Sequence, residues 1–301
     1  MTSMLSIIPT RYRPRVRSMV KGLRNELSGH YAVPLAAPVG YCYIRKNACS
    51  AFRRMIIEHS PHAKRADERP VFYMERCHRL GYGDLAGCAH VVFVIRDPYE
   101  RAVSGYLQQV VSRLDEPYPV LEESVRGVIG RGRAELSFAD FVERYLGAED
   151  FSRIDVHFMP QVAHLAPIRY SDVLLDKRLA EDAVQVFGPA LAEKYFRRPV
   201  NAMAHLARQA DPDAWKIPAS ELHRRFTATG ALPARDDLLT PALRERLAAI
   251  YAADRTLFTR YMEARAADPS RAPALDMRDH DFSAHFSLNR ARRGAPAERG
   301  R

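Results

Sequence analysis

Two short segments of the chain place a positively charged side chain where an anion could bind. In the first, Lys46 lies between an apolar run, residues 39–44, and a segment with helical spacing, residues 51–57. A strand that continues into a helix leaves unpaired backbone N–H groups at the turn, and these attract an anion together with the helix dipole. The Lys46 ammonium adds a point charge, and we expect Ser50 to cap the helix. The pattern indicates a phosphate or sulfate site, although a solvated lysine at a strand–helix junction has the same local sequence.

Arg96 occupies the same kind of position later in the chain. It follows residues 90–95, a continuous β-branched run that is typical of a buried parallel strand. Asp97, Pro98 and Glu100 then supply an N-cap, a first-turn proline and the acid of a capping box. A guanidinium at such a turn can form two hydrogen bonds to a phosphate. The alternative is an ion pair between Arg96 and Asp97 or Glu100.

The glycine and cysteine patterns argue against two common chemistries. The ATPase loop reads Gly-x-x-x-x-Gly-Lys-Ser/Thr, whereas no glycine lies between Gly40 and Lys46. No Cys-x-x-Cys pair and no His/Cys cluster has the spacing of a zinc site. We therefore expect no metal and four reduced thiols, which are Cys42, Cys49, Cys77 and Cys88.

Alternating strand and helix patterns must position these side chains. The strand candidates are residues 39–44, 71–74, 90–95, 154–160 and 168–174. The helix candidates are residues 51–57, 98–114, 137–146, 176–187 and 241–262, with a flexible insertion at 117–132 and a loop-rich stretch at 196–236. The alternation predicts an α/β fold with a P-loop-like, doubly wound, mostly parallel sheet, flanking helices and irregular basic termini. Ligands of such sheets bind beyond the carboxyl ends of strands, where we expect both Lys46 and Arg96.

Composition sets the class and the kind of partner. The chain has 301 residues, an apolar fraction of 47% and a formal net charge of +10. We divide it into a basic N-terminal arm (1–36), an α/β domain (37–265) and a basic, flexible C-terminal tail (266–301). The charge predicts an anionic partner. The arm lacks the apolar core of a signal peptide, and no apolar run reaches the ~20 residues of a membrane span. We expect a cytoplasmic protein whose basic termini contact the anionic inner membrane surface.

Four segments together resemble one family. Residues 46–55 (Lys-Asn-Ala-Cys-Ser-Ala-Phe-Arg-Arg-Met) resemble the 5′-phosphosulfate loop of the Golgi-type carbohydrate sulfotransferases, which runs Pro-Lys-x-Ala-Cys-Ser/Thr-x-Trp-Lys-Arg. Residues 94–106 (Val-Ile-Arg-Asp-Pro-Tyr-Glu-Arg-Ala-Val-Ser-Gly-Tyr) resemble their 3′-phosphate motif. Two shorter similarities follow in the family's order, at residues 157–161 (His-Phe-Met-Pro-Gln) and 250–258 (Ile-Tyr-Ala-Ala-Asp-Arg-Thr-Leu-Phe).

The resemblance implies an activity and a donor site. These enzymes, sulfotransferase family 2 among them, move a sulfuryl group from 3′-phosphoadenosine-5′-phosphosulfate (PAPS) to a hydroxyl or amine, so a carbohydrate or glycolipid acceptor is expected. By similarity, Lys46 holds the 5′-phosphosulfate and neutralises the leaving oxygen, while Arg96 and Ser104 bind the 3′-phosphate. The other expected donor contacts are Arg45, Asn47, Ala48, Cys49, Ser50 and Phe52. Arg45 and Phe52 depart from the family, which has proline and tryptophan there.

Three side chains are candidates for the base that takes the acceptor's proton. His78 comes first, because it follows the predicted strand 71–74, as the presumed base follows a strand in several relatives. A histidine pKa near 6.5 also suits the task. Glu75 and His157 are the alternatives, and a structural role remains open for His78.

Two other functions share the same features. A nucleotide-dependent phosphotransferase would use the same anion-binding turns, but the missing glycines count against it. A non-catalytic binder of nucleic acid or acidic polysaccharide would use the basic ends of the chain and lose affinity steeply with salt. Neither end has the interleaved aromatic residues of single-strand binders, so we expect no specific nucleic-acid partner.

Overall fold

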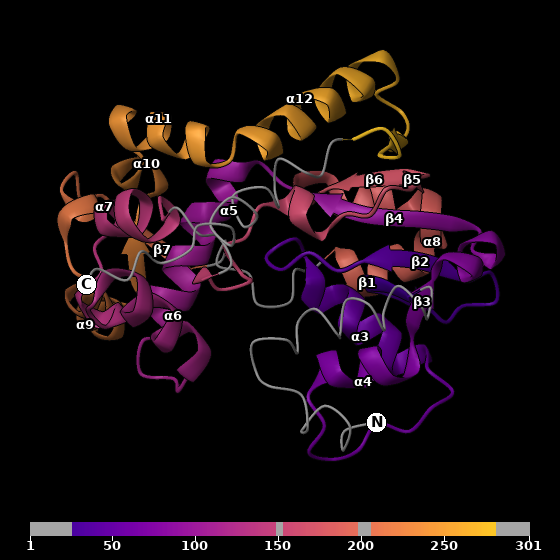
Figure 1. Cartoon of the computed structure of the whole chain (residues 1–301), viewed down its shortest axis with the longest axis horizontal. Coiled ribbons are helices and arrows are strands. Elements are labelled where there is room, and N and C mark those ends of the chain that lie inside the picture. The colour runs from indigo at the N-terminus through magenta and orange to yellow at the C-terminus, as the bar shows by residue number, and fades with distance from the viewer. Residues whose placement is uncertain (1–25, 149–152, 198–205, 281–301) are drawn as a thin grey trace, which may run out of the picture.

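The computed structural model describes residues 26–148, 153–197 and 206–280, and a five-stranded sheet lies at its centre (Figure 1). In spatial order the strands are β3 (Arg79–Gly81), β1 (Glu26–Val33), β2 (Val39–Cys42), β4 (His90–Ile95) and β6 (Asp172–Leu175). Strands β2, β4 and β6 are parallel neighbours, whereas β1 is antiparallel to both β2 and β3. Four of the five strands therefore run in one direction, which confirms the predicted α/β fold with a mostly parallel sheet.

Helices cover both faces of the sheet. On one face α3 (Cys49–His59), α4 (Pro70–Cys77) and α8 (Leu179–Phe196) pack on Tyr41, Val92 and Leu174. On the other face α12 (Ala252–Ala267) and the 3-10 helix η7 (Gln161–His164) pack on Cys42, Phe93 and Val173. Because successive strand residues face opposite sides, a strand covered on both sides is apolar throughout. This explains the uninterrupted apolar run of β4.

A helical lobe lies beside the sheet and has a core of its own (Figure 1). It is entered from β4 through α5 (Pro98–Gly105), which continues as the π-helix η3 (Tyr106–Ser112). Its other helices are α6 (Pro119–Ile129), α7 (Phe138–Asp140), η5 (Phe141–Leu146), α9 (Ala219–Thr229) and α11 (Pro241–Ile250). The shorter elements are η2 (Tyr82–Gly87), η4 (Arg133–Glu135), β5 (Arg169–Tyr170), η8 (Asp176–Arg178), β7 (Ala207–Gln209), η10 (Ala214–Lys216), β8 (Ala231–Pro233), α10 (Arg235–Leu238) and β9 (Leu275–Asp276).

Two local predictions near the site residues are wrong. Residues 71–74 were expected to form a strand, but they belong to α4, which begins with Pro70 in its first turn. A proline at that position is pre-organised for a helix. The predicted cap Ser50 lies inside α3, because the helix begins at Cys49, one residue before Ser50, and Ala48 is its N-cap.

The remaining corrections concern loops and long helices. The predicted insertion at 117–132 contains α6, residues 154–160 form turns rather than a strand, and 196–236 contains α9. The predicted strand 168–174 is divided into β5 and β6. The helix predicted to end at Gly188 instead kinks there, with φ 77°, and continues to Phe196. The long helix predicted over 241–262 is broken at Tyr251 into α11 and α12.

Parts of both predicted termini belong to the folded structure. Strand β1 lies within the predicted arm 1–36, and β9 lies within the predicted tail 266–301, where it pairs with β5. The other basic residues of the arm and tail, up to residue 25 and from residue 281, lie outside the described residues. Within the described ranges, no helix combines the length and the apolar character needed to cross a membrane.

Candidate active site

The Lys46 turn joins the carboxyl end of β2 to α3. Lys46 and Ala48 have φ angles of 71° and 52°, in the left-handed region that side chains disfavour. The buried Asn47 side chain fixes this backbone by donating to the Val94 carbonyl at 2.7 Å and to Gln161 Oε1 at 2.6 Å. Ala48 offers no side-chain acceptor to the first N–H groups of α3. A helix start of this kind suits an anion.

The Lys46 side chain reaches across to the helical lobe. Its ammonium donates to Gln108 Oε1 on η3, so its hydrogen-bond partner is a neutral amide rather than a carboxylate. Burial, and after it the nearby Arg96 guanidinium, lowers the pKa of Lys46 to about 7. An anion beside the ammonium would favour its charged form. The surroundings of Lys46 therefore suit a negatively charged ligand.

The Arg96 turn is in direct contact with the Lys46 turn. Arg96 Nη1 donates to the Lys46 carbonyl at 3.1 Å, and Arg96 Nε lies 3.3 Å from Asp176 Oδ2. The carboxylates expected as alternative partners have other roles. Asp97 caps α5 by accepting the Glu100 N–H at 2.9 Å, and the Glu100 carboxylate pairs with Lys177 and Arg235. The predicted cap is thus confirmed, but Glu100 does not complete a capping box.

A third segment, residues 157–161, lies against both turns. The buried Arg101 of α5 donates to the carbonyl oxygens of Arg45, Met159 and His157, at 3.3, 2.8 and 3.3 Å. Arg101 therefore fixes this segment beside the turn that carries Lys46. Three of the four segments that resemble the sulfotransferases meet at this point.

His157 lies next to the Lys46 turn and is held by an acid. Its Nδ1 is 2.6 Å from Asp155 Oδ1, and its Nε2 is 3.3 Å from Arg45 Nη1. The Tyr118 hydroxyl donates to Asp155 Oδ2 at 3.0 Å. Burial lowers the pKa of His157, while the hydrogen bond to Asp155 raises it. With its Nδ1 proton donated to Asp155, the imidazole presents the Nε2 lone pair, as a general base requires.

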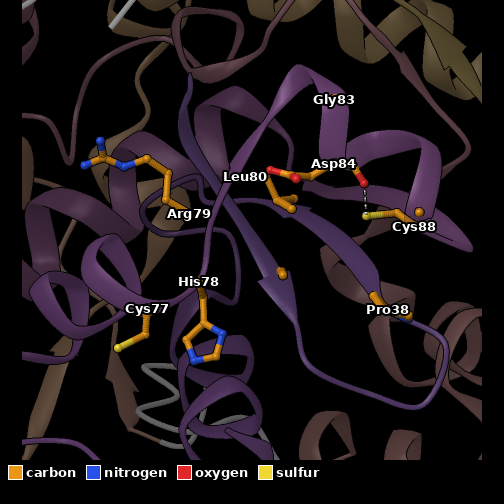
Figure 2. A pocket seen from close by; sticks show the side chains of 10 residues that line it. Pro38, Cys77, His78, Arg79, Leu80, Gly83, Asp84 and Cys88 are labelled. Atoms are coloured by element: carbon orange, nitrogen blue, oxygen red, sulfur yellow. Dashed lines mark hydrogen bonds between the residues drawn. The ribbon is translucent and has the colours of Figure 1, made fainter. Parts of the chain in front are cut away.

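His78 lies elsewhere in the fold. It ends α4, its Nε2 is 2.8 Å from Ser60 Oγ, and its carbonyl accepts from the Ala32 N–H. Since Ala32 pairs with Gly40, His78 lies level with the start of β2, whereas Lys46 follows the end of β2. His78 lines a pocket of about 540 Å³ together with residues of β3 such as Arg79 and Leu80 (Figure 2). The structure therefore places His78, the first candidate for the base, away from the Lys46 turn, and its role as the base stays a prediction.

The other predicted residues divide between the turn and the core. Glu75 accepts from the Tyr31 hydroxyl at 2.8 Å and pairs with Arg79. Phe52 is fully buried and stacks on Tyr41 with ring centroids 3.8 Å apart, so its ring belongs to the core, and its predicted contact with the donor through the backbone stays a prediction. Ser50 Oγ accepts from Arg53 at 3.2 Å in the first turn of α3, which begins at Cys49.

Ser104 lies on α5, half-buried, four residues before Gln108. Residues four apart share one side of a helix, so Ser104 is on the side from which Gln108 reaches Lys46.

Sequence reasoning missed the site residues Gln108, Asp155, Arg101 and Gln161, although the last two lie inside segments that it had singled out. The parts of the chain that the structure describes contain no cluster of three His, Cys, Asp or Glu side chains suited to a metal.

The fold and site define an α/β protein in which two helix-opening turns, carrying Lys46 and Arg96, meet beyond the carboxyl ends of its parallel strands. The model of the sulfotransferase family matches residues 30–261, which include every site residue described above. The chain therefore belongs to the sulfotransferase family, whose chemistry is sulfuryl transfer. Searches of curated proteins and of solved structures gave no match.

Proposed function

We propose that the protein transfers a sulfuryl group from PAPS to a hydroxyl or amine of a carbohydrate or glycolipid. The observation that carries this proposal is the direct contact between the Lys46 and Arg96 turns, each of which opens a helix. A nucleotide with an anionic group at each end of its ribose can reach both turns. The Lys46 turn acts as a P-loop-like cradle that lacks the usual glycines.

Each end of the donor is matched by its own set of groups. Lys46 and the first N–H groups of α3 hold the 5′-phosphosulfate, with Arg45, Asn47 and Cys49 shaping the turn around it. Arg96, whose side chain is 21% exposed, holds the 3′-phosphate through its guanidinium, and Ser104 contributes its hydroxyl. Arginine suits this task because its planar fork can form paired bonds with phosphate.

The chain's own residues stabilise the transfer in two ways. His157 Nε2 takes the proton of the acceptor hydroxyl as the acceptor oxygen bonds to sulfur, and the acceptor displaces Arg45 from that nitrogen. Lys46 neutralises the charge that forms on the 5′-phosphate oxygen as its bond to sulfur breaks. Charge stabilisation of this kind contributes on the order of 10²–10³ in turnover. The buried Asp155 keeps the imidazole in the required tautomer.

The net charge of the chain supports the proposed acceptor and the proposed location of the protein. A net charge of +10 favours an acidic glycan or a glycolipid at an anionic, cytoplasmic membrane surface. The chain then recognises the acceptor in part through long-range attraction, which added salt would weaken.

Titration calorimetry with 3′-phosphoadenosine-5′-phosphate (PAP), the product of the donor, tests the proposal. We expect PAP to bind much more tightly than ADP, because ADP lacks the 3′-phosphate that Arg96 holds. Transfer of labelled sulfate from PAPS to a panel of sugars and glycolipids then identifies the acceptor. Equal affinity for PAP and ADP would contradict the donor assignment and favour a nucleotide-dependent phosphotransferase.

A further inference from the structure

We propose that Gln161 is a positioning residue that sets the spacing between the two anion-binding turns and thereby selects a donor with two anionic ends. The inference rests on the proposed function. Gln161 follows directly after residues 157–160, in a segment that belongs to neither turn. It does not hold the donor itself in this proposal, and acts through the two turns that do.

The side-chain amide of Gln161 bonds to both turns at once. Its Oε1 accepts from Asn47 Nδ2 of the Lys46 turn at 2.6 Å and from the Arg96 N–H at 3.1 Å. Its Nε2 donates to the Arg96 carbonyl at 2.9 Å. The residue is fully buried, so water cannot easily replace these bonds. One oxygen atom is thus the common acceptor through which the turns are held at a fixed separation.

Asp254 of α12 binds both the backbone and the side chain of Gln161. Asp254 Oδ2 accepts the Gln161 N–H at 2.7 Å and lies 3.4 Å from Gln161 Nε2, while Oδ1 accepts the Val162 N–H at 3.0 Å. The Asp254 carboxylate is fully buried, and it satisfies the first N–H groups of η7. Asp254 of α12 therefore holds both the backbone N–H and the side-chain amide of Gln161.

The contacts of Gln161 leave the ligand-binding groups free. Arg96 and Lys46 are also linked directly, but that bond uses the Arg96 guanidinium, which must turn to a phosphate. Gln161 instead bonds to the backbone of Arg96 and to the side chain of Asn47. The bonds of Gln161 to both turns can therefore remain when a ligand binds the Arg96 guanidinium. A fixed spacing favours a ligand that spans both turns, because no ordering of the turns is then needed on binding.

The test compares the affinity of a ligand that has two anionic ends with the affinities of two ligands that each have one anionic end. Affinities are measured by titration calorimetry for PAP, adenosine 5′-monophosphate and adenosine 3′-monophosphate. Gln161→Met keeps the length of the side chain and removes its hydrogen bonds. The matched control is Gln185→Met on α8, an exposed position that bonds to Ser270 and Ala272 outside the site.

We expect Gln161→Met to weaken PAP binding by at least about tenfold and each monophosphate by less than about threefold. The control should bind all three ligands as the wild type does. A uniform loss for all three ligands, or no loss for PAP, overturns the role of Gln161. Failure of the wild type to prefer PAP over both monophosphates instead overturns the proposed donor, and the two failures are therefore distinguishable.

A second variant covers the case in which Gln161→Met does not fold, as judged by circular dichroism. Asp254→Asn keeps the shape of the carboxylate and one of its two acceptor oxygens, so the Gln161 backbone keeps a partner. We expect a smaller loss of PAP affinity than for Gln161→Met, again with little change for the monophosphates. Unchanged PAP affinity in Asp254→Asn would overturn the part assigned to α12.

Discussion

In the proposed mechanism Lys46 acts as a cation, yet its surroundings lower its pKa and so favour the neutral amine. Burial first and then Arg96 lower its pKa to about 7, from the ordinary value of about 10.4. An anionic ligand binds the protonated form more tightly, and so raises this pKa when it binds. Donor affinity should consequently depend on pH in the physiological range, which an ordinary exposed lysine would not cause.

We expect PAP affinity to fall as the pH rises from about 7 to about 9, by up to about tenfold per pH unit. The sign follows because deprotonation above the pKa removes the charge that binds the ligand. The phosphates themselves are already ionised in this range. Calorimetry at several pH values measures the slope. In Lys46→Arg, whose guanidinium stays charged, the slope should vanish; the same slope in both proteins would exclude Lys46 as its origin.

His157 and His78 provide a direct comparison of two histidines. His157→Ala removes the base beside the Lys46 turn, so turnover with labelled PAPS should fall about 10²–10⁴-fold with little change in PAP affinity. His78→Ala changes a residue near the start of β2, and turnover should stay close to the wild-type value. The opposite result, with His78 essential and His157 dispensable, would return the role of the base to the residue that the sequence first indicated.

Individual site residues could be predicted from sequence only where the neighbouring residues determine their position. Lys46 and Arg96 each follow a buried strand directly, so the fold class alone brings them to the same edge. The position of His157 depends on Arg101 and Asp155, which bind it through contacts that no local pattern records. Phe52 matches a motif position, but the aromatic core beneath β2 determines where its ring lies.

At the scale of elements, the cap of α5 lies directly beside Arg96, the residue proposed to bind the 3′-phosphate. Asp97 accepts the Glu100 N–H at 2.9 Å and directly follows Arg96. Ser137 caps α7 in the same way, accepting the Asp140 N–H at 3.1 Å, within the helical lobe. The two caps are similar in geometry but differ in their relation to the site.

Asp97→Ala and Ser137→Ala should each lower the free energy of unfolding by about 1 kcal/mol, as measured by urea denaturation. Only Asp97→Ala should also weaken PAP binding, because the start of α5 then frays beside Arg96. Equal PAP affinity in the two variants would indicate that the order of this helix start does not matter for the ligand.

The elements that could be predicted are those with strong local determinants. Strand β4 consists largely of β-branched residues, and α5 follows with its cap and proline, so the bounds of β4 and the start of α5 at Pro98 were both predicted. The predicted helix 98–114 is formed by α5 and the π-helix η3 together, and it ends at Ser112. Residues 71–74 are rich in apolar and aromatic residues that favour strands, yet packing of Tyr73 and Met74 in the core beside β1 makes them helical. Strand β1 was missed because its place between β2 and β3 depends on pairing with segments that follow it in sequence.

At the scale of the whole molecule, a buried ion pair joins two helices that are far apart in sequence. Arg265 of α12 donates to Asp182 of α8 at 2.8 Å, and both side chains are almost fully buried. Asp182 also accepts the Leu175 N–H at the end of β6, at 2.9 Å. Removing one member of such a pair leaves the other charge buried without compensation.

We expect Asp182→Ala to lower the free energy of unfolding by about 3–5 kcal/mol. The exposed pair of Glu193 on α8 and Arg197 at its C-cap is the control, and Glu193→Ala should change stability by less than about 1 kcal/mol. Urea denaturation of both variants measures the difference. Similar small losses in the two proteins would show that the buried pair contributes no more than the exposed one.

The bond from Asp254 to the backbone of Gln161 joins residues that are 93 positions apart. During translation, the segments that carry Lys46, Arg96 and His157 all leave the ribosome well before α12 is made. A nascent chain that ends before α12 lacks the Asp254 carboxylate that holds the Gln161 backbone and amide. If Gln161 positions the two turns as proposed, we expect donor binding to require α12 and therefore to be acquired late in synthesis.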